Sequence, residues 1–512
     1  MQTETVNDFL EAASAKYGSK TALTFLRRGQ PETQLTFKQL LSDVHQFAAS
    51  LLQMGVRKGD RVILFLPKSV ASIVAHFAIL KIGAMAVPLN PGFKKNEMAY
   101  LLGDARAELI FVTPEKAQLV REIDTNAQIL EMDTARPYQE IDFFRSSNAS
   151  LPAIAVAPDD PGLVIYTSGT TGNPKGAVLT HRNLTYDANN VITIWEIRST
   201  DVLCHALPLF HVHGLCFAVH TALFSGAHIL LLDRFSPESV VDELSRKSGD
   251  AVCTVFMAVP AMYTKLMDYI GDRRIDFSHL RLLTSGSAPL LVKEFKRIST
   301  VFGLEPVERE GMSETGMNFS NPLTGKRIPG SIGIPLPGLQ ARIVDPDACT
   351  DVTQGEIGEI WLKSPAITPG YWRKPQETSD AFKDEWFRTG DLGRVDANGY
   401  YYLTDRIKHI IISGGENVSA KEVETIINQI DGVDESVVVG KPDEKWGEKV
   451  VAAVTLKPGA EVTEAEIKTH CKTNLHDWKC PKEIKFLDAI PRNTMGKMLK
   501  EEVKKLFVDE PV

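Results

Sequence analysis

The hydrophobic pattern of the first third of the chain alternates between two periods. Thr36–Met54 and Ser69–Ile82 carry apolar residues at helical spacing, and the short runs Arg61–Leu66 and Ala84–Leu89 that follow them are apolar almost throughout. Strands that are apolar along their whole length and alternate with helices are typical of parallel sheets covered on both faces. The pattern therefore predicts an α/β domain with parallel strands.

This alternation continues past residue 300 and then gives way to a different pattern. His228–Leu232 is an apolar strand candidate, and Leu280–Thr284 is another that ends at a turn. From about residue 340 onward, short strands separated by Gly, Pro and Asp turns predict a small β-rich subdomain. These strands are expected at Gln340–Val344, Gly358–Leu362 and Gly399–Leu403.

A further compact unit is predicted beyond Asp405. Its first helix, Lys421–Gln429, has apolar residues on one face, and strands at Ser436–Val439 and Val450–Leu456 precede a helix that begins near Thr463. About a hundred residues are enough for a separate small domain. The predicted fold class is therefore α/β. It comprises a large N-terminal domain of α/β sheets with a β-rich subdomain, residues 1–404, and a small α+β C-terminal domain, residues 405–512.

Composition limits the number of domains and the classes of function. A chain of 512 residues is too long for a single hydrophobic core, so two or more domains are expected. The net charge of −8 gives no support to nucleic-acid binding as the main task. The six cysteines include no CxxC pair, which favours reduced thiols over a disulfide framework or a zinc site. The N-terminus lacks the pattern of a secretory signal, and no apolar run approaches the ~20 residues that span a bilayer. We therefore expect a cytoplasmic protein without a transmembrane segment.

A glycine-rich loop is the most informative stretch of the sequence. Tyr166–Gly176 reads YTSGTTGNPKG and follows the apolar strand candidate Gly162–Ile165. Gly169 allows backbone N–H groups to converge on a phosphate, and Lys175 supplies a positive charge. The loop is not a Walker A motif, because Gly176 and not Ser or Thr follows the lysine. Hydroxyl donors are available from Thr167, Ser168, Thr170 and Thr171.

This loop resembles the signature of adenylate-forming enzymes, which include acyl-CoA synthetases, peptide-synthetase adenylation domains and luciferase-like proteins. The resemblance covers about Thr36 to Lys500, with further motifs in the same order. It implies an ATP-dependent acyl-CoA synthetase that uses ATP, Mg²⁺ and coenzyme A. A carboxylic acid and ATP would give acyl-AMP and pyrophosphate, and coenzyme A would then displace AMP from the acyl group.

The segment GMSET, Gly311–Thr315, resembles the family's element for magnesium and nucleotide. The resemblance implies that Glu314, together with Thr170, holds Mg²⁺ against the ATP phosphates, and a hard cation prefers such oxygen ligands. Glu310 stands where the family generally has an aromatic residue that stacks on adenine, and a carboxylate cannot stack. The further ATP-binding or AMP-binding residues implied are Ser287, Ala288, Pro289, Glu310, Gly311, Met312 and Ser313.

Three later segments complete the resemblance. Asp391 in WFRTGD matches the aspartate that accepts hydrogen bonds from the ribose hydroxyls, with Arg406 nearby and Lys408 at the interdomain hinge. Lys497 in PRNTMGKMLK matches the catalytic lysine, whose ammonium would stabilise the charge that develops during adenylation. The loop matching the coenzyme A tunnel contains Gly414, Gly415 and Glu416.

The resemblance also implies a mobile C-terminal domain. Lys175 and Lys497 belong to different predicted domains, so adenylation requires the two domains to close. A rotation of the small domain would then withdraw Lys497 and present the Gly415 loop for thioester formation.

The acid is left open between two classes. The segments FHVHGL, SGSAPL and the long run from GMSET onward look most like malonyl-CoA synthetases, so Arg327 or another pocket arginine would hold a distal carboxylate. Medium-chain or aromatic acids are the alternative, since Met257, Met262 and Met317 would line an adaptable pocket. His213 is interpreted as a buried, hydrogen-bonded histidine. The acyl pocket is predicted at His211, Val212, Met257, Gly286 and Met317, with His211 also assigned to catalysis.

Two other functions compete with this hypothesis. An adenylating ligase would load the phosphopantetheine of a carrier protein in place of coenzyme A. A regulatory protein would bind nucleotide without catalysis, an idea that Glu310 motivates. The predicted partners are a small carboxylic acid, ATP and coenzyme A, with no nucleic acid, for a monomer or homodimer.

Overall fold

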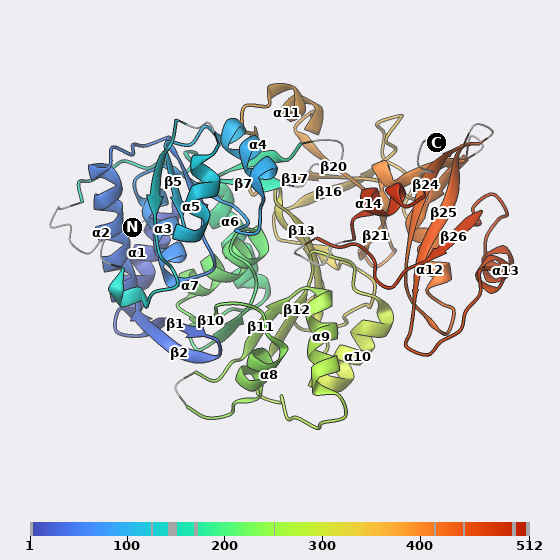
Figure 1. Cartoon of the computed structure of the whole chain (residues 1–512), viewed down its shortest axis with the longest axis horizontal. Coiled ribbons are helices and arrows are strands. Elements are labelled where there is room, and N and C mark those ends of the chain that lie inside the picture. Colours follow the sequence, from blue (N-terminus) through green and yellow to red (C-terminus); the bar gives the residue numbers. More distant parts are fainter. Residues whose placement is uncertain are drawn as a thin grey trace. The chain divides into compact units, whose positions relative to one another are not determined.

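The computed structural model divides the chain into two compact units (Figure 1). The first unit comprises Met1–Gln340 and Leu362–Phe387, and the second comprises Ala341–Trp361 and Arg388–Val512. The predicted boundary between residues 404 and 405 falls inside the second unit and stays a prediction. The structure describes residues 4–123, 126–141, 151–167, 173–249, 251–413, 416–443, 446–493 and 498–507.

A nine-stranded sheet organises much of the first unit. Its central strands are parallel, while β2 and the pair β14 and β15 at its two ends are antiparallel to their neighbours. β1 and β10 pair side by side although they are far apart in the sequence (Figure 1). In order across the sheet, the strands are β15 (Ile334–Pro335), β14 (Gly316–Ser320), β13 (Val307–Met312), β12 (Leu282–Ser285), β11 (Val255–Ala258), β9 (Val202–His205), β10 (His228–Leu232), β1 (Thr21–Arg27) and β2 (Gln30–Thr36).

A seven-stranded sheet forms the other layer of strands in this unit. Its strands are parallel except at β8, which is antiparallel to both of its neighbours. Apolar residues of β3, β4, β5 and β7 pack with α4 and α5 into one core cluster. In order, the strands are β18 (Gly370–Tyr371), β8 (Lys175–Thr180), β7 (Pro161–Thr167), β4 (Met85–Pro88), β3 (Arg61–Phe65), β5 (Leu109–Val112) and β6 (Gln128–Glu131).

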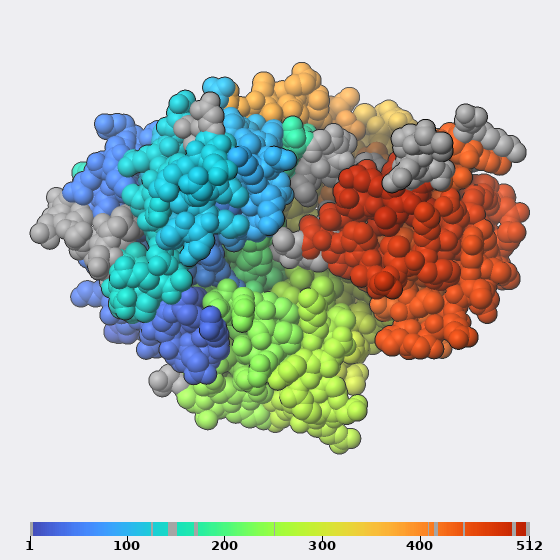
Figure 2. All heavy atoms as spheres, in the orientation of Figure 1, coloured from blue at the N-terminus to red at the C-terminus, as the bar shows by residue number. Residues whose placement is uncertain are grey.

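The helices predicted in the first third are confirmed, and their ends have clear causes. α2 begins after Thr36 and α3 after Ser69, and each N-cap side chain accepts a hydrogen bond from the third residue of its helix. Every residue of α3 from Val70 to Leu80 is buried, including Ser72 and His76, which fits its largely apolar sequence. Figure 2 shows the early, blue residues of this unit packed directly against its green residues.

The described helices of the first unit mostly alternate with its strands, as predicted. They are α1 (Val6–Tyr17), α2 (Phe37–Gln53), α3 (Val70–Lys81), α4 (Lys95–Ala105), α5 (Pro114–Arg121), η1 (Tyr138–Glu140), α6 (His181–Ile194), the π-helix η2 (His213–His220), α7 (Thr221–Ser225), α8 (Pro237–Ser245), α9 (Pro260–Ile270), α10 (Val292–Phe302) and α11 (Pro375–Ala381). A short strand, β19 (Phe382–Lys383), pairs with the beginning of β20 (Trp386–Val395).

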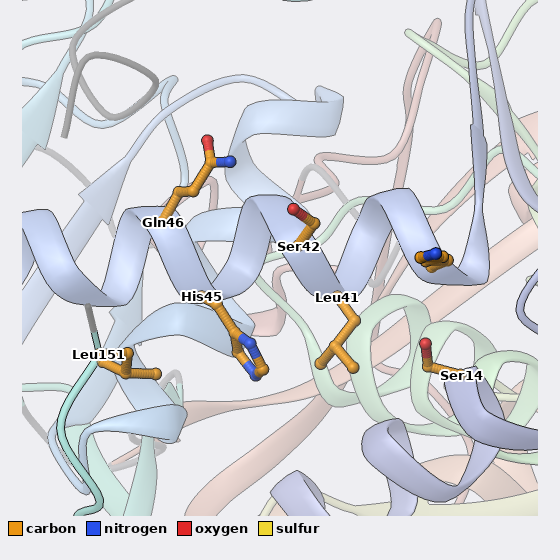
Figure 3. A pocket seen from close by; sticks show the side chains of 7 residues that line it. Ser14, Leu41, Ser42, His45, Gln46 and Leu151 are labelled. Carbon is orange, nitrogen blue, oxygen red and sulfur yellow. The ribbon is translucent and has the colours of Figure 1, made fainter. Parts of the chain in front are cut away.

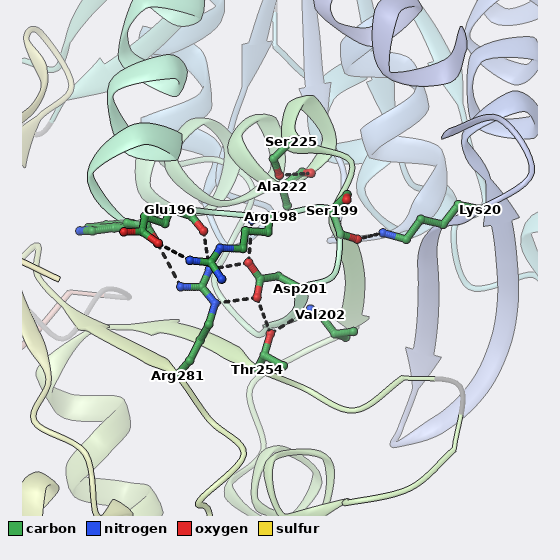
Figure 4. A network of polar contacts seen from close by, with 11 residues as sticks. Lys20, Glu196, Arg198, Ser199, Asp201, Val202, Ala222, Ser225, Thr254 and Arg281 are labelled. Atoms are coloured by element: carbon green, nitrogen blue, oxygen red, sulfur yellow. Dashed lines mark hydrogen bonds and ion pairs between the residues drawn. The ribbon is translucent and has the colours of Figure 1, made fainter. Parts of the chain in front are cut away.

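A polar network fixes the amino ends of three strands in the nine-stranded sheet (Figure 4). Asp201 precedes β9, Thr254 precedes β11 and Arg281 precedes β12. The Asp201 carboxylate accepts hydrogen bonds from Arg281 Nε at 2.7 Å and from Thr254 Oγ1 at 2.9 Å. Arg281 also donates to the backbone carbonyls of Trp195 and Glu196, both at 3.0 Å. The donors of this partly buried guanidinium therefore bond to the buried Asp201 carboxylate and to two backbone carbonyls.

The second unit contains the predicted β-rich segment and the C-terminal α+β segment. β17 lies between β16 and β20, and β21 pairs with β20. In the C-terminal sheet, helices α12 and α13 cover one apolar cluster, and α14 contributes to another. The elements are β16 (Gln340–Val344), β17 (Gly358–Lys363), β21 (Tyr401–Arg406), η3 (Ile407–His409), β22 (Ile410–Ser413), β23 (Glu416–Ser419), α12 (Ala420–Ile427), β24 (Val433–Asp443), β25 (Gly447–Leu456), α13 (Glu464–Asn474), β26 (Glu483–Phe486) and α14 (Lys500–Lys505).

Several predicted strand boundaries are wrong: β12 begins at Leu282 and not Leu280, β25 begins at Gly447 and not Val450, and two others differ for clear local reasons. The strand expected at Gly399–Leu403 begins at Tyr401, because Gly399 belongs to the preceding turn and donates its N–H to the Asp396 carbonyl. The strand expected at Ser436–Val439 is only the continuously buried middle of the longer β24. Within the described residues, no helix is both long and apolar enough to cross a bilayer.

Candidate functional site

Several predicted site residues of the first unit lie at one edge of the nine-stranded sheet, while Thr167 and Lys175 belong to the seven-stranded sheet. β9, β11, β12 and β13 run parallel, so their carboxyl ends meet at the same edge. Met257 lies in β11, and Gly286 directly follows β12. Open α/β sheets bind ligands outside the carboxyl ends of their strands. The Asp201 network lies at the opposite ends of these strands, away from the candidate site.

The strand predicted before the glycine-rich loop is confirmed as β7, and a second strand, β8, begins at Lys175. Thr167 pairs with Lys175 across these antiparallel strands, and its hydroxyl donates to the Lys175 carbonyl at 3.3 Å. The Tyr166 hydroxyl donates to Asp104 Oδ2 at 2.8 Å, which ties the end of β7 to α4. The predicted phosphate-binding residues Ser168, Gly169, Thr170 and Thr171 lie outside the described residues.

The GMSET segment forms the turn between β13 and β14. Glu314 is buried in this turn, with a relative exposure of 7%. Its Oε1 accepts a hydrogen bond from the Tyr371 hydroxyl at 3.1 Å, and its backbone carbonyl accepts one from the Thr368 N–H at 2.7 Å. Ser313 lies in the same turn. A carboxylate fixed in this way has the chemistry that Mg²⁺ prefers in its ligands, so Glu314 fits the predicted metal role.

Close backbone contacts explain the glycines of this turn. A Cβ atom at Gly311 would lie 2.6 Å from the Gly316 carbonyl oxygen, and one at Gly316 would lie 2.6 Å from Asp187 Oδ1. Asp187 also accepts a hydrogen bond from the Met317 N–H at 2.8 Å. Burial raises the pKa of Asp187 to about 7, although the Met317 hydrogen bond lowers it. Asp187 therefore anchors the turn from α6.

Glu310 makes a polar contact at the place where an aromatic residue is more usual. Its Oε2 accepts a hydrogen bond from Asn318 Nδ2 at 3.0 Å, and the same amide donates to Thr315 Oγ1 at 2.8 Å. Glu310 and Gly311 lie on β13, and Asn318 lies on the antiparallel β14. The position beside the GMSET turn that the resemblance assigns to adenine stacking thus carries a hydrogen-bonded carboxylate in this chain.

The acyl-pocket residues come from three separate segments. Val212, Met257 and Met317 are buried. His211 is partly buried, and burial lowers its pKa to about 4, so its imidazole is neutral at pH 7. His213 begins η2, and its Nδ1 lies 3.2 Å from Ser287 Oγ, which confirms the buried, hydrogen-bonded histidine.

Arg309 is the unexpected residue of this region. It lies on β13, is only 2% exposed, and its Nε, Nη1 and Nη2 atoms have no hydrogen-bond partner in the part of the chain that the structure describes. Its guanidinium carbon lies 5.1 Å from the centre of the Phe217 ring. A Cβ atom at Gly286 would lie 2.6 Å from Arg309 Nε, so a glycine is needed there. Burial lowers the pKa of Arg309 to about 10 although the nearby carboxylates of Glu310 and Asp187 raise it, so Arg309 is charged at pH 7.

Arg327, the arginine proposed from sequence to hold a distal carboxylate, is already engaged. Its Nε donates to the Pro322 carbonyl at 3.2 Å and its Nη2 to the Leu323 carbonyl at 2.8 Å. Its Nη1 donates to the Glu305 carbonyl. Arg327 therefore binds the backbone of its own turn and of Glu305, whereas the buried Arg309 has no hydrogen-bond partner among the described residues.

The predicted ribose residues meet in the second unit. β20 and β21 pair Asp391 with Arg406, and Arg406 Nε lies 2.6 Å from Asp391 Oδ1. The buried Glu359 supports this strand, because its Oε1 accepts the Gly390 N–H at 3.0 Å and its Oε2 lies 3.3 Å from Arg388 Nη2. The structure thus brings the two predicted residues together and adds Glu359 as their support.

The other predictions for the second unit are not tested. Lys497, Gly414 and Gly415 lie outside the described residues. Lys408 and Glu416 are described only through their backbone, in η3 and at the start of β23. The catalytic lysine, the hinge and the coenzyme A loop therefore stay predictions.

A surface hollow of about 440 Å³ lies elsewhere in the first unit and contains none of the predicted site residues (Figure 3). Lys38, Leu41, Ser42, His45 and Gln46 line it from α2. Ser14 and Leu151 complete its lining. The hollow is therefore separate from the candidate site.

Sequence analysis missed Arg309, Tyr371, Asp187 and Glu359. Arg309 and Glu359 occur beside other charged residues, which is the usual pattern of an exposed strand, and Tyr371 lies far along the chain from Glu314. The one available signal was the sequence Glu308–Glu310, in which an arginine lies between two acids immediately before GMSET.

Known proteins resemble this chain over nearly its whole length. Residues 10–372 match the AMP-binding enzyme family, and residues 422–497 match the AMP-binding enzyme C-terminal domain. A feruloyl-CoA synthase from Amycolatopsis sp is 35% identical over 93% of this chain and 94% of its own length. A mitochondrial malonate–CoA ligase from Bos taurus is 34% identical over 89% of this chain and 83% of its own length.

Solved structures agree with this assignment. The crystal structure of ATP-bound MatB from Rhodopseudomonas palustris has a TM-score of 0.90 and 34% identity, and the match covers 98% of this chain and 99% of that one. The relatives are named as coenzyme A ligases, so a purely regulatory role finds no support among them. The chain belongs to the AMP-binding enzyme family and is an AMP-forming acyl-CoA ligase.

Proposed function

We propose that this acyl-CoA ligase activates a short dicarboxylic acid such as malonate. One carboxylate would be adenylated, and Arg309 would bind the other. The observation that carries the proposal is the buried Arg309 guanidinium, whose three nitrogen atoms lack hydrogen-bond partners among the described residues. A buried charge without a partner is costly, and a guanidinium matches a carboxylate through two parallel hydrogen bonds.

Neighbouring groups support an anion at this place. The His213 Nε2 and Ser285 Oγ atoms are also buried, and neither has a hydrogen-bond partner in the described residues. Burial lowers the pKa of His213 well below its usual value, and the charge of Arg309 lowers it further, so His213 is neutral and close enough to Arg309 to feel its charge. Buried polar groups without partners occur where a ligand completes their hydrogen bonds.

In the first half-reaction, the reacting carboxylate would attack the α-phosphate of ATP. The glycine-rich loop and Lys175 would bind the phosphates, and Asp391 would accept hydrogen bonds from the ribose. Lys497 would stabilise the negative charge that builds between the carboxylate and the phosphate. Glu314 and Thr170 would hold Mg²⁺, which neutralises charge on the departing pyrophosphate when it is bound.

In the second half-reaction, the thiol sulfur of coenzyme A would attack the acyl-adenylate carbonyl, and AMP would leave. Gly414, Gly415 and Glu416 would line the coenzyme A path after a rotation at Lys408 of the domain formed by residues 405–512. The neutral His211 would flank the reacting carboxylate.

Pyrophosphate release provides the test. Malonate is compared with propionate and succinate with butyrate, which match in carbon number, beside ferulate and a medium-chain acid. We expect kcat/KM for the preferred diacid to exceed that of its matched monoacid by about a hundredfold or more, because a monoacid leaves Arg309 unpaired. Equal rates for diacids and monoacids, or a preference for ferulate, would refute the diacid proposal.

The acceptor is tested in the same assay. Free coenzyme A should yield an acyl thioester, while a carrier protein bearing phosphopantetheine should yield none. Acylation of the carrier in preference to coenzyme A would favour the carrier-loading alternative.

A further inference from the structure

Tyr371 contacts two residues that the proposed function assigns to the ATP phosphates. Its hydroxyl donates to Glu314 Oε1 at 3.1 Å. The Lys175 ammonium lies 5.2 Å from the centre of its aromatic ring. One side chain therefore links the GMSET turn to the base of the glycine-rich loop.

The backbone around Tyr371 is fixed from several sides. Tyr371 pairs with Ala177 on β8, and its N–H donates to Thr378 Oγ1 at 2.9 Å. The neighbouring Trp372 N–H donates to the Gly176 carbonyl at 2.7 Å. On the other side, the Thr368 N–H donates to the Glu314 carbonyl. These bonds hold Tyr371 at a constant position between the two segments.

The hydrogen bond from the Tyr371 hydroxyl restricts the orientation of the Glu314 carboxylate. Glu314 is almost wholly buried, and a buried carboxylate keeps one orientation only when its oxygens are hydrogen-bonded. The bond from Tyr371 restrains Oε1 and so restricts the orientations open to the carboxylate. Hydrogen bonds of this kind to a metal-binding carboxylate orient it before the metal arrives.

The aromatic ring holds Lys175 without neutralising it. The separation of 5.2 Å is within the range in which a ring face attracts an ammonium group. An acidic partner would hold the lysine more firmly and would cancel its charge. A ring leaves the full positive charge available to phosphate oxygens.

We propose that Tyr371 is a positioning residue that sets the orientation of Glu314 through its hydroxyl and the location of Lys175 through its ring. The proposal rests on the proposed function, because it takes Glu314 as a metal ligand and Lys175 as a phosphate ligand. It predicts that the two contacts can be separated by substitution.

The test compares Tyr371→Phe, which removes only the hydroxyl, with Tyr371→Leu, which removes the hydroxyl and the ring. Binding of Mn²⁺ to the enzyme–ATP complex is measured by electron paramagnetic resonance, and ATP binding without metal is measured by calorimetry. Tyr371→Phe should weaken Mn²⁺ binding about tenfold and leave metal-free ATP binding unchanged. Tyr371→Leu should weaken Mn²⁺ binding similarly and also weaken metal-free ATP binding about threefold.

Tyr402→Phe is the matched control, because its hydroxyl also donates to a carboxylate, Asp396 Oδ2, at 3.0 Å. This variant should bind Mn²⁺ and ATP as the wild type does. In addition, Tyr371→Phe should have no effect on Mn²⁺ binding when it is introduced into Glu314→Gln. This double variant separates a role through Glu314 from a general loss of structure.

Wild-type Mn²⁺ affinity in Tyr371→Phe would overturn the proposal, as would an equal loss of Mn²⁺ binding in the presence and absence of Glu314. Failure of the proposed function is a different result. In that case the wild type would release pyrophosphate with monoacids as fast as with diacids, whatever the binding data for Tyr371.

Discussion

Arg281 and Arg309 lie beside opposite ends of the same strand, β12, and their surroundings differ completely. Arg281 precedes β12 and is bonded to Asp201 and to two backbone carbonyls. Arg309, on the neighbouring β13, lies beside the carboxyl end of β12, and its three guanidinium nitrogens have no partner among the described residues. The arginine at the amino end of β12 therefore has hydrogen-bond partners for its guanidinium, and the arginine beside the carboxyl end has none among the described residues.

The difference separates stability from function. A buried ion pair with all its hydrogen bonds resists the loss of either member, because the remaining charge would be stranded. An unpaired buried charge destabilises the free protein and is retained where a ligand supplies the missing partner. Arg281 is thus expected to matter for folding and Arg309 for substrate binding.

The largest effect is expected on the free energy of unfolding, when the pair between Arg281 and Asp201 is broken. Arg281→Met leaves the Asp201 carboxylate buried without its main partner and should lower the free energy of unfolding by about 4 kcal/mol. Urea unfolding measures the loss. Arg297→Met removes an exposed pair with Asp268 and should cost at most about 0.5 kcal/mol, so equal losses in the two variants would contradict the comparison.

Substitution of Arg309 should have the opposite effect, a loss of activity without a loss of stability. Arg309→Met removes a buried charge and should leave the free energy of unfolding equal to or above that of the wild type. The same substitution should lower kcat/KM for the preferred diacid about a hundredfold, because the distal carboxylate loses its partner, while rates with monoacids change little. Stability is measured in urea and activity by pyrophosphate release. A destabilised variant with unchanged diacid selectivity would reverse the assignment.

As the pH falls, the free energy of unfolding should decrease first through His205 and His213, which lie near the carboxyl ends of the strands, and only later through Asp201. Burial lowers the pKa of His205 to about 3 and that of His213 well below 6.5. Both histidines are neutral in the fold and gain protons on unfolding once the pH falls below 6.5. Each therefore removes about 1.4 kcal/mol of stability per pH unit below that value, or about 2 kcal/mol at pH 5.

For Asp201, burial alone raises the pKa, but the hydrogen bonds from Arg281 and the Arg198 N–H bring it below its usual value of 3.8. Its contribution is therefore lost only when the pH falls below about 4. Urea unfolding at pH 7.5, 6 and 5 should show a smaller acid loss in His205→Gln than in the wild type. An unchanged pH dependence would remove His205 from this explanation.

The smallest effect is expected on KM, when the space beside Arg309 is filled by a substitution at Gly286. Gly286→Ala places a Cβ atom against Arg309 Nε and should raise KM for the diacid about tenfold by displacing the guanidinium. Gly103→Ala is the control, because a Cβ atom there meets nothing within 4 Å. Equal KM values for the two variants would show that the position of Arg309 is not limited by Gly286.

Much of the fold and several motifs could be predicted from sequence, because they depend on local patterns. The limits of α2 and α3 follow from their caps and apolar periods, and Gln340–Val344 appears as predicted. The hairpin around GMSET and the pairing of Asp391 with Arg406 agree with the motifs. These features are determined by residues that are close together in the chain.

The unpredicted features depend on contacts between distant segments. Arg309 is buried only because β13 lies between β12 and β14 in the sheet, so its local sequence is not informative. The bond from Tyr371 to Glu314 depends on β18 pairing with β8. The engagement of Arg327 by three backbone carbonyls likewise depends on the fold of its turn.

The division of the chain between its two units has a consequence for genetic truncation. The first unit takes Met1–Gln340 and Leu362–Phe387, and the second takes the intervening Ala341–Trp361 together with Arg388–Val512. No single cut in the gene can therefore express either unit intact, since every continuous fragment lacks a segment or carries a foreign one. An isolated half of this enzyme would need a redesigned connection in which two separate stretches of coding sequence are joined.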